Sequence, residues 1–290
     1  MKISDILQKE KIGLSCELFP PKTGSQLGNV KEVVKEMAQL KPSYMSITYG
    51  ASGGTSEYTV NIADEIQNTN HIPALAHLTC VSSTREKVHD VIRQLKESKI
   101  DNILALRGDI PSETDFPLPE QYRYASELIY DIKSMGDFCI GGACYPEGHP
   151  ESGSIREDLV YLKEKVDAGC DFLTTQMFFD NNIYYNFMYK LLQKNITVPV
   201  VAGIMPVTNA VQIKRIIALS GNMLPARFQA IVERFADEPA AMRQAGIACA
   251  TEQIIDLIAN GVNHVHIYTM NRPDVAGEIF GNLSEIFIRK

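Results

Sequence analysis

Short apolar runs alternate with amphipathic segments along the whole 290-residue chain. The apolar runs are bounded by turn-forming residues, as buried strands are, and the segments between them repeat apolar residues at helical spacing. The pattern predicts eight strands, at residues 13–19, 44–49, 74–79, 102–106, 138–144, 172–175, 198–202 and 264–268. The expected helices cover residues 25–39, 58–68, 84–98, 124–134, 154–168, 184–194, 209–219 and 225–260, with a short closing helix after Arg272.

The repeated strand–helix unit indicates one closed barrel. Most units recur at roughly 30 residues, the length of a strand with its crossover helix, and no Pro- or Ser-rich linker divides the chain. We therefore expect an α/β fold, a single-domain (β/α)8 TIM barrel over residues 1–290. An open doubly wound sheet is the alternative, but the eight units and the missing G-x-G-x-x-G loop after the first strand favour the barrel.

Composition and charge narrow the class of protein. Hydrophobic residues make up 45% of the chain and the net charge is −7, which argues against a nucleic-acid surface but leaves room for a local basic pocket. The six cysteines form no C-x-x-C pair, so small buried side chains in a reducing compartment are favoured over a disulfide framework or a metal site. Because neither a signal-peptide core nor a bilayer-length apolar run is present, we expect a cytoplasmic protein with no membrane partner.

Polar side chains mark the carboxyl end of almost every predicted strand, where barrels carry their active sites. Glu17 and His77 lie within otherwise apolar strands, where an unpaired charge is costly. The other strand-end positions are Thr48, Tyr49, the run Arg107-Gly108-Asp109, Tyr145, His149, Gln176 and Tyr268. We therefore expect one pocket on the carboxyl face of the barrel.

Nine segments, taken in their order and spacing, resemble the 5,10-methylenetetrahydrofolate reductase family. They are ELFPPK (17–22), SITYGA (46–51), HLTC (77–80), ALRGD (105–109), YPEGHP (145–150), KVDAG (165–169), TQMFFD (175–180), GIMP (203–206) and HIYTMNR (266–272). Each is weak by itself, but together they span nearly the whole chain. The chain looks like the short bacterial form, without the C-terminal regulatory domain of eukaryotic members.

The resemblance implies a barrel that binds FAD non-covalently and takes electrons from NADH or NADPH. It implies reduction of 5,10-methylenetetrahydrofolate to 5-methyltetrahydrofolate by a ping-pong hydride relay through the flavin, which feeds methyl groups to methionine synthesis. By analogy with the family we also expect a homo-oligomer. The choice between NADH and NADPH stays open, as does a ferredoxin or partner-subunit donor.

Two acidic residues carry the chemistry that the resemblance implies. Glu17 is expected to be the general acid that protonates the departing folate nitrogen, and apolar Leu18 and Phe19 beside it suit a carboxyl with a raised pKa. Asp109 is expected near both the flavin ring and the pterin, where its charge would stabilise a cationic iminium. The structural alternatives are a Glu17 carboxylate paired with a barrel Arg or Lys, and an Arg107–Asp109 pair that closes a turn.

The remaining site residues are expected from the resemblance. FAD contacts are expected at Thr48, Tyr49, Ala51, His77, Arg107, Gly108, Asp109, Ala125, Tyr145, His149, Ser152, Asp158, Tyr161, Glu164 and Lys165, and Lys165 suits a phosphate. Substrate contacts are expected at Asp109, Gln176, Gln212, Tyr268 and Arg272. Four positions depart from the family's pattern: Tyr161 and Glu164 on the FAD side, Ile216 where an aromatic residue can stack, and Cys170 where Ala is usual.

Two other functional interpretations stay open. One is a different barrel enzyme, such as a Schiff-base aldolase or a flavin-dependent proline dehydrogenase; an aldolase needs a lysine inside a strand near the pocket, and the predicted strands supply no good candidate. The other is a non-catalytic flavin- or folate-binding subunit of a redox complex, which would need neither Glu17 nor Gln176.

Overall fold

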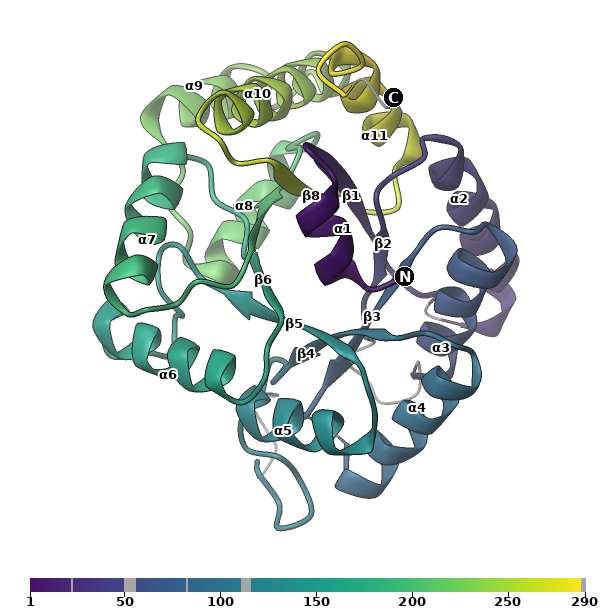
Figure 1. The fold of residues 1–290 in the computed structure, drawn as a ribbon. Coiled ribbons are helices and arrows are strands. Elements are labelled where there is room, and N and C mark those ends of the chain that lie inside the picture. Colours follow the sequence, from purple (N-terminus) through teal and green to yellow (C-terminus); the bar gives the residue numbers. More distant parts are fainter. Residues whose placement is uncertain (22, 50–55, 82, 111–115, 288–290) are drawn as a thin grey trace.

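The strands of the chain form one closed barrel. The computed structural model describes residues 1–21, 23–49, 56–81, 83–110 and 116–287, and its parallel strands follow one another around the ring in chain order (Figure 1). They are β1 (Gly13–Leu18), β2 (Met45–Ile47), β3 (Ala74–Thr79), β4 (Asn102–Leu106), β5 (Cys139–Cys144), β6 (Phe172–Thr175), β7 (Val200–Ile204) and β8 (His264–Tyr268). Because β1 pairs with β8 in parallel, the predicted barrel is confirmed and the open doubly wound sheet is wrong.

Helices cover the outside of the ring, as the crossovers of a parallel sheet require (Figure 1). They are α2 (Leu27–Gln39), α3 (Ser56–Asp64), α4 (Arg85–Glu97), α5 (Ala125–Met135), α6 (Ile155–Asp167), α7 (Asn181–Gln193), α8 (Ala210–Ser220), α9 (Ala226–Arg234), α10 (Pro239–Ala259) and α11 (Pro273–Asn282), with a short 3-10 helix η1 (Gly24–Gln26) and a π-helical segment η2 (Glu65–Thr69). The predicted region 225–260 is two helices, because Pro239, which has no N–H to donate, opens α10. Within the described ranges, no helix combines the length and apolar character needed to cross a bilayer.

The amino-terminal helix closes one end of the barrel. α1 (Ile3–Lys9) lies across the centre of the ring of strands (Figure 1). Its buried side chains Ile3, Ile6 and Leu7 pack against inward-facing strand residues that include Leu75 and Phe172. This apolar floor excludes water from the lower part of the barrel.

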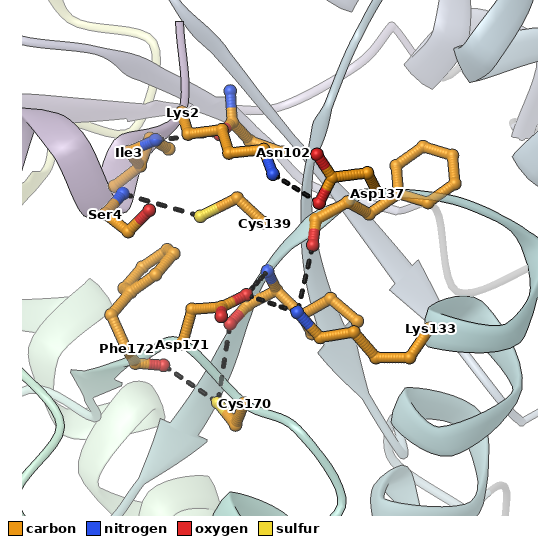
Figure 2. A network of polar contacts seen from close by, with 12 residues as sticks. Lys2, Ile3, Ser4, Asn102, Lys133, Asp137, Cys139, Cys170, Asp171 and Phe172 are labelled. Carbon is orange, nitrogen blue, oxygen red and sulfur yellow. Dashed lines mark hydrogen bonds and ion pairs between the residues drawn. The ribbon is translucent and has the colours of Figure 1, made fainter.

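Figure 2 shows polar contacts that fasten this floor. Asn102 Oδ1 accepts a hydrogen bond from the Ile3 amide at 2.8 Å, and Cys139 Sγ accepts one from the next amide of α1 at 3.4 Å. Nearby, Lys133 Nζ donates to Asp171 Oδ2 at 2.8 Å. These contacts join α1 to β4 and β5, and α5 to the start of β6. The carboxyl end of the barrel is therefore the end left for a cavity.

The cysteines belong to the core. Five are buried, Cys249 is partly buried, and all six are free thiols. Cys170, which stands where the family's pattern has Ala, lies with its Sγ 2.9 Å from the Phe172 carbonyl oxygen. The interpretation of the cysteines as small buried side chains is therefore confirmed at five of the six positions.

Candidate active site

A cavity of about 690 Å³ opens at the carboxyl end of the barrel, a volume typical of sites for small ligands. Every strand contributes to its lining directly or through the loop that follows. In strand order the contributions include Glu17, Thr48, His77, Arg107, Tyr145, Gln176, Met205 and Tyr268. The cavity lies where the polar strand ends predict it.

Glu17 and His77 face each other inside the barrel. Glu17 Oε2 lies 3.8 Å from His77 Nε2, and His77 Nε2 is buried without a hydrogen-bond partner among the described residues. Burial raises the pKa of Glu17 to about 8 and lowers the pKa of His77 to about 3, because water reaches neither charged form. At neutral pH a protonated carboxyl therefore faces a neutral imidazole. The structural alternative was an ion pair between Glu17 and an Arg or Lys of the barrel. Among the described residues, the ionisable side chain that faces Glu17 is His77 instead.

Tyr268 is fixed across the cavity by close packing at Gly203. The Tyr268 hydroxyl donates to the Thr175 carbonyl oxygen at 2.5 Å. A Cβ at Gly203 would lie 2.6 Å from that hydroxyl oxygen and 2.3 Å from the Thr175 oxygen, so a side chain here would displace the tyrosine. The glycine of the GIMP segment thus lets β8 reach β6 directly beside Gln176.

Arg107 is held by a carboxylate that sequence reasoning missed. Its Nη1 and Nη2 donate to the two oxygens of Glu151 at 2.7 and 2.6 Å, and its Nε donates to the Gly108 carbonyl at 3.2 Å. Gly108 has φ +86°, a left-handed conformation that favours glycine. The predicted alternative, an Arg107–Asp109 pair, is wrong, since Glu151 takes the guanidinium. No local pattern links the two residues, because they lie 44 positions apart in the sequence.

The side chain of Lys165 extends from α6 past β5 into the cavity. A Cβ at Gly142 would lie 2.9 Å from Lys165 Cδ, so this glycine makes room for the lysine stem. The Nζ donates to the Ala143 carbonyl at 2.6 Å, and burial lowers the pKa of the ammonium group. On the same helix, Asp158 Oδ1 accepts from Ser152 Oγ at 3.4 Å. Burial raises the pKa of the Asp158 carboxyl.

Aromatic rings flank the outer part of the cavity. Tyr124 and Tyr161 stack with ring centroids 6.3 Å apart and an interplanar angle of 16°. Tyr145 and His149 meet edge to face at 4.6 Å. Tyr124 stands directly before Ala125, the first residue of α5. Tyr161, one of the departures from the family's pattern, thus gives the cavity a second flat surface.

Acidic side chains outnumber basic ones in the lining. The acidic residues are Glu17, Asp109, Glu151, Glu157, Asp158 and Glu164, and the basic ones are Arg107 and Lys165. The first turns of α5 and α6 also border the cavity, at Ala125 and Asp158. Helix amino termini carry partial positive charge, so they offset part of this acidity.

Two of the predicted contacts, Gln212 and Arg272, are not among the described residues that line the cavity. Gln212 lies in the first turn of α8, where its amide donates to Asn209 Oδ1 at 2.9 Å. Arg272 donates to Asp274 through Nε at 2.9 Å and Nη2 at 2.8 Å. Ala51 lies outside the described residues. The other predicted site residues all line the cavity, and the contacts of each with a ligand stay predictions.

Comparison with known proteins agrees with the resemblance. The family model for methylenetetrahydrofolate reductase matches residues 2–284. The chain is 34% identical over 266 residues to the 5,10-methylenetetrahydrofolate reductase of Pectobacterium carotovorum, with 92% of this chain and 88% of the relative covered. The Escherichia coli K12 enzyme of the same name gives the same identity and coverage.

A longer plant relative and a solved structure of lower sequence identity also match. Methylenetetrahydrofolate reductase (NADH) 1 of Arabidopsis thaliana is 35% identical over 298 residues, covering 98% of this chain but 50% of the plant protein, so the chain spans about half of that relative. A solved structure of a Clostridium thermocellum protein, described as binding two copies of 5-methyl-5,6,7,8-tetrahydrofolic acid, superposes with a TM-score of 0.62 at 15% identity over 98% of both chains. At that identity it supports the fold. From the family model and the bacterial relatives, the chain belongs to the methylenetetrahydrofolate reductase family.

Proposed function

We propose that the protein catalyses the FAD-dependent reduction of 5,10-methylenetetrahydrofolate to 5-methyltetrahydrofolate, with NADH or NADPH as electron donor. The observation that carries this proposal is the buried Glu17 carboxyl, whose pKa burial raises to about 8, in the cavity of a chain of this family. Opening the imidazolidine ring needs a group that holds a proton at neutral pH and can release it to a nitrogen leaving group.

Proton delivery is the task of Glu17 in the folate half-reaction. As the ring C–N bond breaks, its electron pair stays on the nitrogen, which takes the proton from the Glu17 carboxyl. The folate is left with a cationic iminium, and the carboxylate of Asp109 stabilises that charge. Gln176 accepts from the Met177 amide at 3.0 Å through its side-chain oxygen, so its NH2 group serves as donor to the pterin or to the nicotinamide.

The residues around the cavity fit FAD. FAD, when bound, would supply the hydride-transfer chemistry that links the nicotinamide donor to the folate. The buried His77 Nε2, unpaired within the described residues, is suited to a polar edge of the flavin ring. Lys165 and the first turn of α6 suit the phosphates, Asp158 suits a ribose hydroxyl, and the Tyr124–Tyr161 surface suits adenine.

The relatives support both the donor and the substrate of this proposal. Several are named as NADH enzymes, among them the Arabidopsis protein, which makes NADH the first donor to test. The Clostridium thermocellum barrel is described as a protein that binds methyltetrahydrofolate, so the same architecture accommodates this class of pterin.

The alternatives from the sequence have less support. Lys165 lines the cavity from α6, outside the strands, and its Nζ is hydrogen-bonded to the Ala143 carbonyl, unlike the strand lysine expected of a Schiff-base aldolase. A non-catalytic subunit would have no need of the paired Glu17 and His77. Family membership weighs against an aldolase and a proline dehydrogenase alike.

A visible spectrum of the pure protein tests the proposal. The flavin bands should bleach on anaerobic addition of NADH or NADPH and recover on addition of methylenetetrahydrofolate, because one pocket serves the two ligands in turn. Steady-state kinetics should then be ping-pong. Colourless protein that cannot be reconstituted with FAD would refute the proposal. Flavin bands that bleach on addition of proline, and not on addition of NADH or NADPH, would redirect it to the alternative dehydrogenase, which oxidises proline and reduces its flavin.

We further propose that this single barrel works in the cytoplasm as a homo-oligomer and supplies methyl groups for methionine synthesis. The support for this proposal is the similarity to bacterial methylenetetrahydrofolate reductases, of which the match covers 88%. Size-exclusion chromatography with light scattering tests the oligomer.

A further inference from the structure

The turn between β8 and α11, residues 269–272, is bonded to the backbone around Glu17. Thr269 Oγ1 donates to the Glu17 carbonyl oxygen at 2.7 Å. Two residues on, Asn271 Oδ1 accepts from the Phe19 amide at 2.8 Å and Asn271 Nδ2 donates to the Phe19 carbonyl at 3.0 Å. The side-chain amide of Asn271 therefore satisfies both backbone groups of Phe19, as a neighbouring strand would.

These bonds begin where the regular ladder ends. β1 and β8 pair as far as Glu17 with Tyr268, and the two strands adjoin in the ring (Figure 1). Beyond that pair, side chains of the β8–α11 turn replace backbone partners. Glu17 and Phe19 both line the cavity, as does Met270 from the turn itself. The turn thus extends the β1–β8 contact up to the rim of the site.

The backbone of the turn is in an unusual conformation that makes this bonding possible. Met270 and Asn271 have φ of 53° and 56°, the left-handed region that non-glycine residues seldom adopt twice in succession. Asn tolerates this region better than most residues, because its short polar side chain can bond to nearby backbone. Such a conformation persists where surrounding contacts hold it, and it is frequent at functional sites.

We propose that Asn271, assisted by Thr269, is a positioning residue for the acid Glu17. It fixes the backbone on the carboxyl side of Glu17, so that the carboxyl, buried beside His77, meets the departing folate nitrogen without a search for the reactive geometry. The role rests on the proposed function, since it matters in the half-reaction where Glu17 gives up its proton. Flavin reduction by the nicotinamide donor needs no proton from Glu17.

The test distinguishes the effect of the Asn271 side-chain amide from the effect of the left-handed backbone at this position. Asn271→Gly keeps the left-handed φ without strain and removes both bonds to Phe19. Asn195, at the end of α7, has φ 54° and is exposed, so Asn195→Gly is the matched control. Thr269→Val removes the bond to the Glu17 carbonyl with little change of shape, and it provides a second variant should Asn271→Gly fail to fold.

We expect flavin reoxidation by saturating methylenetetrahydrofolate to slow by roughly tenfold or more in Asn271→Gly and by a smaller factor in Thr269→Val, because small displacements of a reacting group are costly. FAD content and the rate of reduction by NADH should stay at the Asn195→Gly level, and so should the folate concentration for half-maximal reoxidation. This split between chemistry and binding is the signature of positioning.

Other outcomes count against the role. Reoxidation of Asn271→Gly and Thr269→Val at control rates would refute it while the proposed function stood. Parallel losses of FAD, reduction and reoxidation would also refute it, since they indicate a role in overall folding. Wild-type protein that methylenetetrahydrofolate does not reoxidise would overturn the proposed function itself, and the role of Asn271 with it.

Discussion

Glu17 owes its expected chemistry to what surrounds it. Its side chain leaves β1 toward the inside of the barrel, where burial raises its pKa to about 8, and its neighbour across the barrel, His77, stays neutral because burial lowers the pKa of the imidazole to about 3. A cationic partner in that position would have held the carboxylate ionised. The pair therefore stores one proton on the carboxyl at the pH of a cell.

Replacing Glu17 with Gln keeps the size of the side chain and removes the transferable proton. We expect Glu17→Gln to leave reduction of FAD by NADH within about twofold of wild type, while reoxidation by methylenetetrahydrofolate slows by roughly 10²- to 10⁴-fold, the range of general acid catalysis. Anaerobic stopped-flow absorbance measures both half-reactions. Equal losses in the two would contradict the role of Glu17 as acid.

The raised pKa of Glu17 also predicts how stability depends on pH. Its pKa is about 8 in the folded protein and ordinarily 4.5, so between these values the folded state keeps a proton that the unfolded state releases. The contribution of Glu17 to the free energy of unfolding therefore falls as pH rises through this window. Glu17→Gln lacks that dependence. Its Tm relative to wild type should be higher near pH 8 than near pH 5 by at least about 2 °C, and an equal difference at both pH values would mean that the pKa is not raised.

At the scale of elements, pairs between distant loops shape the rim of the cavity. Arg107 follows β4, and Glu151 lies in the loop between β5 and α6. From that same loop, Glu147 accepts hydrogen bonds from Asn222 Nδ2 and the Met223 amide, both at 2.8 Å, which ties it to the segment between α8 and α9. The β5–α6 loop is thereby fixed on two sides.

The sequence predicts the elements better than it predicts these ties. Buried parallel strands are continuous apolar runs, so β3, β4, β6 and β8 begin and end where the pattern places them. β7 begins at Val200, two residues later than predicted, because Pro199 has no N–H for the ladder. The Arg107–Glu151 contact joins residues 44 apart in sequence, and no local pattern encodes such a pair. The polar strand ends therefore predicted where the cavity lies. The side-chain pairs within the cavity could be identified only from the folded structure.

The Arg107–Glu151 pair leads to a prediction about FAD affinity. Glu151→Gln removes the charge that orients Arg107 and should raise the Kd for FAD about two- to fivefold at low salt, as expected for a pair with one partner near the surface. Added salt should weaken FAD binding less in the variant than in wild type. Fluorescence titration of the apoprotein with FAD measures both effects.

A matched control exists for this variant. Glu252 receives two hydrogen bonds from Arg227, at 3.1 and 3.0 Å, between α9 and α10, and neither residue lines the cavity. Glu252→Gln should leave the Kd for FAD unchanged. If the two variants had the same Kd for FAD, the Arg107–Glu151 pair would have no role in FAD binding.

For the molecule as a whole, the interior of the barrel changes character from floor to cavity. Next to α1 the inward side chains are apolar, as at Leu75 and Phe172. Above them His266 bonds Ser15 Oγ through Nδ1 at 2.7 Å and Ser46 Oγ through Nε2 at 3.0 Å. Glu17 and His77 come next, at the cavity. The apolar layers beneath the cavity close the barrel from below, and burial at the cavity raises the pKa of Glu17.

A substitution at the closed end of the barrel should lower stability without changing the chemistry at the carboxyl end. Asn102 is buried and bonds Ile3 of α1, the Met1 carbonyl and the Ala74 carbonyl of β3. Asn102→Ala leaves these backbone groups without partners, which should cost about 2–4 kcal/mol and lower the Tm by several degrees.

The chemistry should survive this change, because α1 and Asn102 lie at the closed end, away from the cavity lining. Flavin content and both half-reactions at 25 °C should match those of Asn260→Ala, an exposed control that bonds the Asp256 carbonyl at 2.8 Å. Differential scanning calorimetry and stopped-flow absorbance on the same samples make the comparison. Slowed reoxidation in folded Asn102→Ala, with normal flavin content, would show that water entering through the floor reaches Glu17, and the two ends would then be coupled more tightly than the hydrogen bonds indicate.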